Sequence, residues 1–407
     1  MLLGLKSREK MSVNELKRYR HHKSILSLLY KGKPMSAPEL AKKISVSLPT
    51  VFQLLNELIA SGLVDARGTG ASTGGRKPLL YGLAEESLFV ISCDMGRYSA
   101  QMTIFNSHNQ RVTPVRQVET HIDDSDLVSK LHLTAQELIN EYNIPLEKVV
   151  GLGIDMPGLV DANLGINYTI KDCSLQNIRE RLQEKFTMYV YIDNDARMQA
   201  YGEYIFGKAR DIRNAVVVNW SWGVGMGMIM NGKLYGGSTG FAGELSHIQM
   251  AEEGDLCICG KRGCLETVAS ANTILRLALE GLTNGKVTQL SASFGENPEK
   301  LTPEDVILAA RSGDEFSISL LSKIGLSLGK GLSVIIQLMN PEIIVLSGPL
   351  ARANQFVLTP IQQAINKFCL EKIVANTTIV TSDIDGQSGL LGSAAMVYKH
   401  LFSEQIN

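Results

Sequence analysis

Three cysteines, one histidine and two glutamates lie within about two dozen residues of this chain, between positions 243 and 266. Four of these side chains are candidate ligands of one metal ion: His247, Cys257, Cys259 and Cys264. One imidazole and three thiolates complete a tetrahedral zinc site. Gly260 and Gly263 lie where a chain that wraps a metal must turn tightly. The alternative is a group of buried cysteines that share a loop without a metal. The close spacing in a glycine-rich turn favours structural zinc.

The two glutamates lie on either side of the candidate metal ligands. Glu244 comes three residues before the histidine, and Glu266 comes two residues after the last cysteine. A metal that holds this loop would also hold both carboxylates in place. The segment therefore predicts a site for a polar ligand beside a structural metal.

This segment resembles the signature of the ROK family, named for repressors, open reading frames and sugar kinases. The matching boxes are GELSH at 243–247 and CICGKRGCLE at 257–266. The glycines Gly223, Gly225, Gly227, Gly232 and Gly243 also fit. The resemblance covers roughly residues 85–407. It implies an α/β body of two lobes, with the ribonuclease-H-like fold of actin and hexokinase and the ligand in the cleft.

The resemblance also implies which residues hold a sugar. The matching positions are Asn194, Asp195, Glu244, His247 and Glu266. Carboxylate and amide groups pair with vicinal hydroxyls, and a buried polar site rejects analogues that lack those hydroxyls. In the kinases of the family, Asp195 would be the general base that takes the proton of the attacking hydroxyl. Its structural alternative is the N-cap of the following helix.

The resemblance is poorest at the three turns that would hold ATP. The kinases have a DxGGT-type turn after the first strand, whereas residues 94–98 read DMGRY, with Arg97 and Tyr98 in place of glycine and threonine. The second turn, 221–223, reads SWG, and the third, 347–349, reads SGP, in which proline removes a backbone donor. Arg97 is still able to contact a phosphate. We nevertheless expect ATP and Mg²⁺ not to bind.

The charge of the chain is divided unequally between its two parts. Residues 1–80 carry a net charge of +9, and the remainder carries −10. A basic front joined to an acidic body predicts that the front contacts a polyanion. The length of 407 residues and the 44% hydrophobic content allow two or three domains with sizeable cores.

Compartment is predicted from cysteine usage and from hydropathy. Six cysteines, three of them in one cluster, fit a reducing environment. The first ten residues have too short an apolar run for a signal peptide. The uncharged run 214–232 contains Asn219, Ser221 and glycines, so it predicts two strands joined by a turn rather than a membrane span. We expect a cytoplasmic protein without membrane insertion.

Residues 12–62 carry the signals of three short helices. Residues 12–15 and 36–39 both have capping-box spacing. The third helix is predicted to begin near Ser47, with Pro49 in its first turn, and to stop at Gly62. Its apolar positions follow helical spacing: Val51, Leu54, Leu55, Leu58 and Ile59. Two predicted strands, 63–67 and 78–81, follow it. The pattern is typical of a winged helix-turn-helix.

The predicted DNA contacts lie on the third helix and on the wing. The helix would present Ser47, Thr50, Gln53 and Asn56 to bases. The glycine- and serine-rich loop 68–77 ends in Arg76 and Lys77, which suit a minor groove or phosphates. The alternative is a small helical domain that binds a protein and has a solvated basic face.

The body reads as two α/β halves with related openings. Predicted strands are 88–94, 100–105, 149–155, 189–192, 215–219 and 343–347, and the segment 125–142 is a predicted helix. Polar residues at strand ends, such as the run 193–195, mark the usual ligand edge of an α/β sheet.

These observations give one prediction of architecture and function. Residues 1–84 form a winged helix-turn-helix, and residues 85–407 form a two-lobed sugar-binding domain with a zinc loop at 243–266. The chain is predicted to be a transcriptional regulator, most simply a repressor of carbohydrate-utilisation genes. It would bind double-stranded operator DNA as a homodimer or homotetramer and respond to a sugar or sugar phosphate. The alternative is an active ATP-dependent, glucokinase-like sugar kinase with a DNA-binding head.

Overall fold

The computed structural model describes residues 11–31, 34–70, 77–96, 98–294, 297, 300–384 and 386–403. The chain divides into two compact units. The first contains Met1–Met156, Leu164–Ile192 and Ser393–Asn407, and the second contains Pro157–Asn163 and Asp193–Gly392. The first unit therefore holds the predicted head together with one lobe of the body, and the second unit holds the other lobe.

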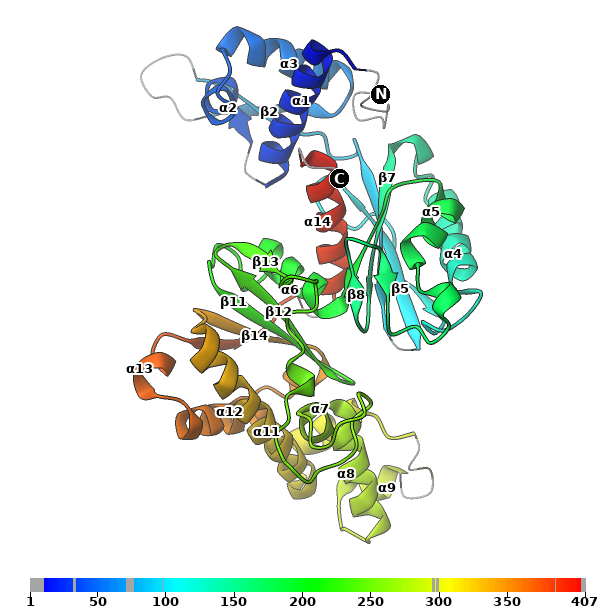
Figure 1. Ribbon diagram of the computed structural model, residues 1–407, viewed down its shortest axis with the longest axis vertical. Coiled ribbons are helices and arrows are strands. Elements are labelled where there is room, and N and C mark those ends of the chain that lie inside the picture. The colour runs from blue at the N-terminus through cyan, green and yellow to red at the C-terminus, as the bar shows by residue number, and fades with distance from the viewer. Residues whose placement is uncertain are drawn as a thin grey trace. The chain divides into compact units, whose positions relative to one another are not determined.

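The head of the first unit is a three-helix domain with a small antiparallel sheet (Figure 1). Its elements are α1 (Val13–Lys31), β1 (Met35–Ser36), α2 (Ala37–Ile44), α3 (Leu48–Ala60), β2 (Val64–Thr69) and β3 (Leu79–Leu83). Both capping boxes form: the backbone N–H of Ser12 donates to Glu15 over 2.8 Å, and that of Ser36 donates to Glu39 over 2.8 Å. The three predicted helices and the two wing strands are confirmed. Strand β1 was not predicted, because two residues carry no readable periodicity.

Helix α3 packs into the head through one apolar stripe. Val51, Leu54, Leu55 and Leu58 are buried, as predicted. Ile59 was expected on the same face, but it is 40% exposed. At roughly 100° per residue, position 59 lies about 80° from position 51, at the margin of the stripe. The buried face is therefore narrower than the sequence suggested.

The lobe in the first unit is a five-stranded sheet in the order β10-β7-β4-β5-β6. Its strands are β4 (Phe89–Met95), β5 (Ser99–Asn106), β6 (Arg116–Glu119), β7 (Val149–Met156) and β10 (Val190–Asn194). Helices α4 (Leu127–Glu141) and α5 (Ile178–Phe186) cover one face, and helix α14 (Ser388–Phe402) lies on the other (Figure 1). A Cβ on Gly153 of β7 would meet the Ser393 carbonyl at 2.4 Å, so glycine is required for this close approach.

The second unit contains a five-stranded sheet in the order β13-β12-β11-β14-β15. Its arrangement of strands is the same as that of the sheet in the first unit. Its strands are β11 (Ala215–Trp220), β12 (Val224–Met230), β13 (Lys233–Tyr235), β14 (Ile343–Ser347) and β15 (Thr378–Thr381). Strand β11 pairs antiparallel with β12 and parallel with β14, as β4 does with β5 and β7. The predicted turn within 214–232 and the related openings of the two halves are confirmed.

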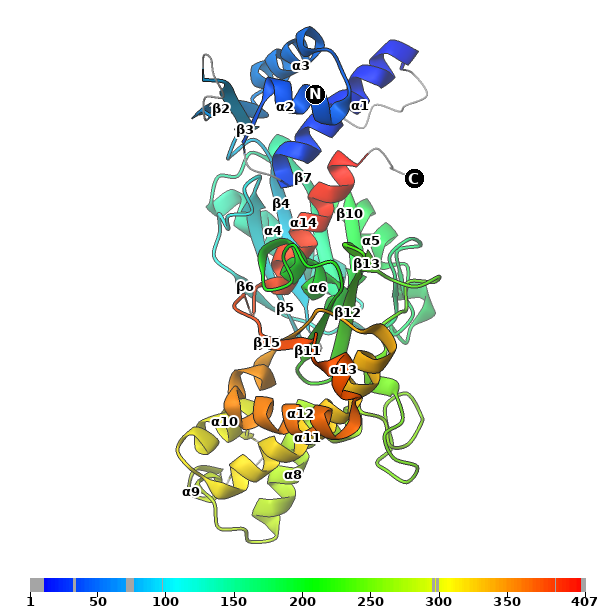
Figure 2. The ribbon, with the colours of Figure 1, turned by 90° about the vertical axis from the view of Figure 1, so that its left-hand side faces the viewer.

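Helices cover both faces of this second sheet (Figure 2). The helices of this unit, of which some lie away from the sheet, are α6 (Asp195–Phe206), α7 (Glu266–Ala269), α8 (Ala271–Thr283), α9 (Gln289–Phe294), α10 (Pro303–Arg311), α11 (Glu315–Met339), α12 (Gln355–Phe368) and α13 (Glu371–Val374). Val217 of β11 packs with Ala200 of α6, whereas its neighbour Val218 packs in the cluster that contains Leu328 of α11. Alternation along the strand thus supplies both cores.

Helix α11 is the core helix of the second unit and packs beside α12 (Figures 1 and 2). Glycine brings the two helices close, since a Cβ on Gly329 would lie 2.7 Å from that of Ala364. Among the described residues, α11 is the one helix with the length and apolarity of a membrane span, and 56% of its apolar window is buried within the protein. That burial is typical of a core helix.

Candidate functional site

The four predicted metal ligands meet in one cluster in the second unit. The ligand atoms of His247, Cys257, Cys259 and Cys264 all lie within 4.8 Å of one another. The Sγ of Cys257 is 3.6 Å from the Nδ1 of His247, and the Sγ atoms of Cys259 and Cys264 are 3.7 Å apart. A tetrahedral zinc ion with its usual bond lengths would place such pairs about 3.5 and 3.8 Å apart. The donor set and these two separations fit a closed zinc site.

The loop that carries the cysteines is fixed by its own backbone. The N–H of Cys257 donates to the Lys261 carbonyl over 2.8 Å, and the N–H of Gly260 donates to the Cys257 carbonyl over 2.9 Å. Gly263 has a φ of +69°, and a Cβ there would lie 2.0 Å from the Ala251 carbonyl. Tight local turns therefore bring the cysteines together, as the glycines predicted.

The three thiols lie in different surroundings. Burial raises the pKa of the Cys264 thiol to about 12 and also raises the pKa of the Cys257 thiol. The backbone N–H of Lys261 lowers the pKa of the Cys259 thiol. Thiolates are the metal-binding form, and a bound cation reverses the effect of burial by stabilising them. Metal binding here would release protons from the buried thiols.

The predicted sugar residues Asn194 and Asp195 lie at the start of α6. The Asn194 side chain caps α6 by accepting from the backbone N–H of Arg197 over 3.1 Å. The Asn194 amide donates to Asp195 over 3.0 Å and to the Gly158 carbonyl over 3.1 Å. Asn194, and not Asp195, is therefore the N-cap, because it is the last residue with extended backbone. The structural alternative for Asp195 was wrong.

Two further residues of this site were missed by the sequence reasoning. Asn219, at the end of β11, donates its amide to Asp195 over 3.3 Å. The buried Arg197 pairs with Asp193 and donates to the Val160 carbonyl over 3.4 Å. Asn219 carried a usable signal, since it is a polar residue at a strand end, as are 193–195. Arg197 carried a weaker signal: Asp193 lies four residues before it, one helical turn away, but Val160 is 37 residues away in the chain.

Both candidate glutamates lie near the metal cluster, since Glu244 is close to His247 and Glu266 acts electrostatically on Cys257. Glu244 is 3.9 Å from the Nε2 of His247. Burial raises the pKa of the Glu244 carboxyl, the nearby Glu266 raises it further, and His247 and Arg197 oppose that rise. A Cβ added to Gly223 would lie 2.8 Å from Glu266, so this glycine gives the carboxylate its room. These carboxylates can accept hydrogen bonds from a polyhydroxylated ligand.

The three turns compared with ATP-binding turns each have a distinct local structure. In the first unit, the Gly96 N–H closes a turn onto the Ser99 carbonyl over 2.8 Å, and Tyr98 is 68% exposed; Arg97 lies outside the described residues. In the second unit, Trp222 is 46% exposed, and Pro349 opens the short helix Pro349–Ala353. These are the three turns at which the sequence departs from the pattern of the kinases.

The predicted DNA-contact residues divide into two kinds. Gln53 and Asn56 are exposed on α3, and Lys77 is exposed beside the wing. Ser47 caps α3, and its hydroxyl lies 2.7 Å from that of Thr50, so these two side chains already serve the helix terminus. Arg76 lies outside the described residues. Gln53 and Asn56 remain the freest candidates for base contact on this helix.

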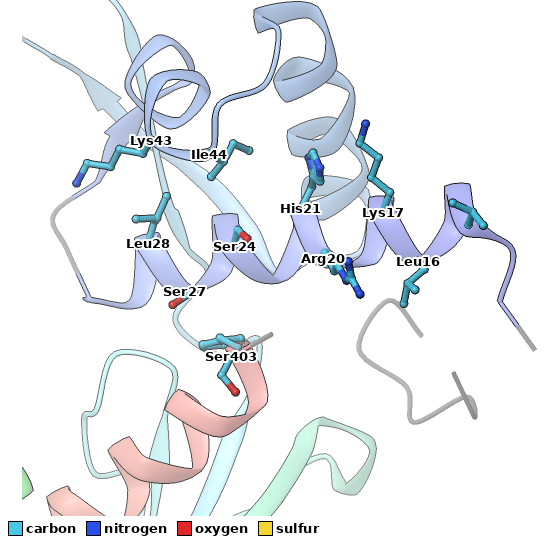
Figure 3. Close-up of a pocket in the computed structure, with 12 residues that line it drawn as sticks. Leu16, Lys17, Arg20, His21, Ser24, Ser27, Leu28, Lys43, Ile44 and Ser403 are labelled. Carbon is cyan, nitrogen blue, oxygen red and sulfur yellow. The ribbon is translucent and has the colours of Figure 1, made fainter. Parts of the chain in front are cut away.

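A pocket of about 830 Å³ lies along α1, between the head and the end of α14. It is lined by none of the candidate sugar or metal residues. Figure 3 shows Lys17 and His21 on one side of α1 and Leu16 and Arg20 on the other. Its basic groups therefore do not converge on one point, and the pocket lacks the convergent polar groups of a ligand site.

Comparison with protein families matches two parts of the chain. Residues 90–400 match the ROK family, and residues 20–65 match a winged helix-turn-helix DNA-binding family. The first match covers most of the body and the second covers most of the described head. The body thus has the actin- and hexokinase-like ROK fold that the sequence predicted, behind an N-terminal winged helix-turn-helix.

Known relatives include both regulators and kinases. The N-acetylglucosamine repressor of Escherichia coli O6:H1 is 27% identical over 372 residues, which cover 91% of this chain and 90% of the repressor. A glucokinase of Halalkalibacterium halodurans is 32% identical over 252 residues, 61% of this chain and 76% of the kinase. The crystal structure of a ROK transcriptional regulator, a homologue of the E. coli MLC protein, has a TM-score of 0.81 at 24% identity and covers 95% of this chain and 97% of its own.

Proposed function

This chain belongs to the ROK family, and on that premise we propose that it is a sugar-responsive transcriptional regulator that binds operator DNA through its head. The observation that carries the proposal is that one chain contains both a DNA-binding type of head and a ROK body. A winged helix-turn-helix with exposed Gln53 and Asn56 precedes a body whose candidate sugar residues all belong to one unit. The similarity to a sugar-named repressor runs through both parts, whereas the similarity to a glucokinase covers 61% of the chain.

The effector site in this proposal consists of the groups around the start of α6 and the cysteine loop. Asn194, Asp195, Glu244, His247 and Glu266 bind the hydroxyls of a sugar or sugar phosphate. Amide and carboxylate groups together offer the donors and acceptors that a polyol needs. His247 contributes through the fixed orientation that its metal bond imposes.

Zinc is proposed as the structural metal of the cysteine loop. Cys257, Cys259, Cys264 and His247 would hold it, and the ion would keep Glu244 and Glu266 at fixed positions. Closed four-ligand sites of this kind contribute folding free energy directly. A direct bond from the metal to His247 couples the order of the loop to the ligand groups.

The remaining assignments follow from the regulator proposal. We assign residues 1–84 to the DNA-binding head and 85–407 to the sugar-binding body. The protein acts in the cytoplasm as a homodimer or homotetramer, since operators with two half-sites require two heads. The head contacts phosphates through Lys77 and Arg76, and bases through the exposed face of α3.

A DNA-binding titration tests the proposal. The full chain is added to fluorescein-labelled DNA from upstream of its own gene, at several salt concentrations, with and without a panel of sugars and their 6-phosphates. A regulator must lose DNA affinity steeply with salt, because phosphate contacts release counterions. It must also change affinity with at least one sugar or sugar phosphate. Weak, salt-insensitive binding would contradict operator binding by the head and would favour the alternative, a domain that binds a protein.

An active sugar kinase is the second candidate, favoured by Asp195 at the position of the family's general base and by the similarity to a glucokinase. A coupled assay with Mg-ATP and the same sugars separates the two. Turnover of roughly 1 to 100 per second, the ordinary range for kinases, would overturn the regulator proposal in favour of catalysis. The three altered turns lead us to expect no turnover above background.

A further inference from the structure

The chain contains two tryptophans, and their surroundings are opposite. Trp220 is fully buried at the end of β11, where its indole N–H donates to the Ala269 carbonyl. Trp222, two residues later, is 46% exposed. A large aromatic side chain left in contact with solvent loses the free energy that its burial would provide.

The exposed indole projects from a backbone that is held firmly. The Ser221 carbonyl accepts from the Ala271 N–H over 2.9 Å, and the Trp222 carbonyl accepts from the Asn272 side chain over 3.0 Å. Both donors belong to the first turn of α8. The exposure of Trp222 is thus a property of a fixed turn and not of a loose loop.

The same turn lies between two groups of candidate sugar residues, all within the second unit. Gly223 follows Trp222, and a Cβ on it would lie 2.8 Å from Glu266. Asn219, three residues before Trp222, donates its amide to Asp195 over 3.3 Å. The main chain of Trp222 therefore links the Glu266 side of the site to the Asp195 side.

We propose that the indole of Trp222 forms one wall of the effector site and stacks on the C–H face of a pyranose ring. This inference rests on the proposed function and specifies how the site recognises its ligand. A pyranose has polar hydroxyls around its rim and a face of C–H groups, and the electron-rich face of an indole attracts such weakly positive hydrogens. The carboxylates of Glu266 and Asp195 and the amide of Asn219, which lie on the two sides of the turn, then bind the hydroxyls of the rim. Sites that combine aromatic walls with a few placed polar groups are typical of small-molecule binding.

The chemistry of the indole also restricts what can lie against it. Its single polar group is the Nε1–H donor, and it carries no charge. A phosphate group at this wall would lose its hydration without gaining adequate donors. Trp222 therefore faces the carbon skeleton of the effector, and any phosphate that the effector carries points away from this turn.

Intrinsic fluorescence tests the inference on the full-length protein, because Trp222 is the accessible emitter of two. Glucose, N-acetylglucosamine and their 6-phosphates are titrated, and affinity is measured independently by calorimetry. A ligand that binds should alter the emission and protect it from quenching by acrylamide. Trp222→Leu should weaken binding by roughly fivefold to tenfold, whereas Trp222→Phe, which keeps an aromatic face, should remain closer to the parent protein.

A matched control is Tyr235→Leu, which removes another aromatic side chain with 46% exposure from the same unit and should leave affinity unchanged. Calorimetry can show that a sugar binds while the emission of the parent protein does not respond and Trp222→Leu binds as tightly as the parent. In that case the proposed stacking on Trp222 is wrong, but the effector site is retained. If none of the four compounds binds, the inference fails together with the sugar response proposed for this site. Thermal melting of each variant separates a binding defect from a folding defect.

Discussion

At the scale of single residues, the cysteine cluster is the part of this protein with the most specific chemistry. The separations of 3.6 and 3.7 Å between two pairs of its candidate ligands fit a tetrahedral zinc ion. Each ligand depends on the others, since a metal held by three ligands in an open site is weaker and more labile than one held by four. Removal of one thiol should therefore affect the whole loop.

We expect Cys257→Ser to lose the bound metal and the sugar response together. The hydroxyl of serine is a poor ligand for zinc, and the loop that places Glu244 and Glu266 would no longer be fixed. Metal content by elemental analysis should fall from about one ion per chain to near zero, with a lower melting temperature. The matched control is Cys173→Ser, which changes an exposed cysteine outside the cluster. Retention of both metal and sugar response by Cys257→Ser would refute the coupling.

His22 gives the head a predictable dependence on pH. Burial lowers the pKa of its imidazole, Arg18 lowers it further, and Glu57 partly opposes both. A histidine with a folded pKa below the unfolded value of about 6.5 binds its proton first in the unfolded state. The associated stability is therefore fully present above about pH 6.5 and is lost as the pH falls from there through the lower folded pKa.

Thermal melts between pH 7.5 and 5 should show this loss, and His22→Gln should reduce it. Burial also lowers the pKa of His132 and His400, so the variant keeps part of the slope. Glutamine can still donate to Glu57, which preserves the contact between α1 and α3. Identical pH profiles for the variant and the parent protein would contradict the assignment to His22.

At the scale of elements, α3 is both a structural helix and a candidate recognition helix. Its inner face is buried in the head. On α3, Glu57 accepts a hydrogen bond from Arg18 of α1, and its carboxylate lies 3.0 Å from the Nε2 of His22, also on α1. These contacts fix the helix from behind and leave its outer face exposed. The two kinds of polar residue on α3 should therefore respond differently to substitution.

We expect Gln53→Ala to weaken operator binding without lowering the stability of the head. Ser47→Ala should mainly lower stability, because it removes the N-cap of α3. Loss of a bidentate base contact costs about 1–3 kcal/mol of binding free energy, whereas loss of an N-cap costs about 1 kcal/mol of stability. Anisotropy titrations on operator and unrelated DNA, together with melts of both variants, separate the effects. A Gln53→Ala protein that binds the operator as tightly as the parent would remove this residue from the interface.

At the scale of the whole molecule, α14 is the element that both units share. Its first residues belong to the second unit, where a Cβ on Gly392 would lie 1.9 Å from the Met198 carbonyl of α6. Its last turns belong to the first unit, where Tyr398 and Phe402 pack on Tyr30 of α1 with ring centroids 4.9 and 5.7 Å away. One continuous helix therefore contacts the helix of the candidate sugar site at one end and the DNA-binding head at the other.

We expect Tyr30→Leu to leave sugar affinity unchanged and to reduce the effect of sugar on DNA affinity. The substitution removes both ring contacts and the 2.7 Å hydrogen bond to Asn109, so a shift of α14 would pass less completely to the head. The two affinities are measured in a full thermodynamic cycle, because coupling is a free energy shared by both sites. Tyr142→Leu, a change at an exposed tyrosine on the surface of the lobe, is the control. An unchanged coupling energy would exclude the aromatic contact from the response.

The sequence by itself determined the features that are local in the chain. The capped helices of the head, the turns at Gly260 and Gly263 and the cluster of candidate metal ligands at 247–264 are each encoded within one short segment, where spacing limits the geometry. The strand-turn-strand openings of the two lobes were predicted for the same reason. The DNA-contact residues and the sugar residues stay predictions from pattern and resemblance until binding is measured.

Only the tertiary structure decided which distant residues share the site. Asn219 reaches Asp195, and Arg197 reaches the Val160 carbonyl, because strands and helices far apart in the chain pack around one helix terminus. It also decided that Asn194 caps α6 and that Trp222 stays exposed while Trp220 is buried. These outcomes depend on close packing against other elements, which the periodicity of one segment does not record.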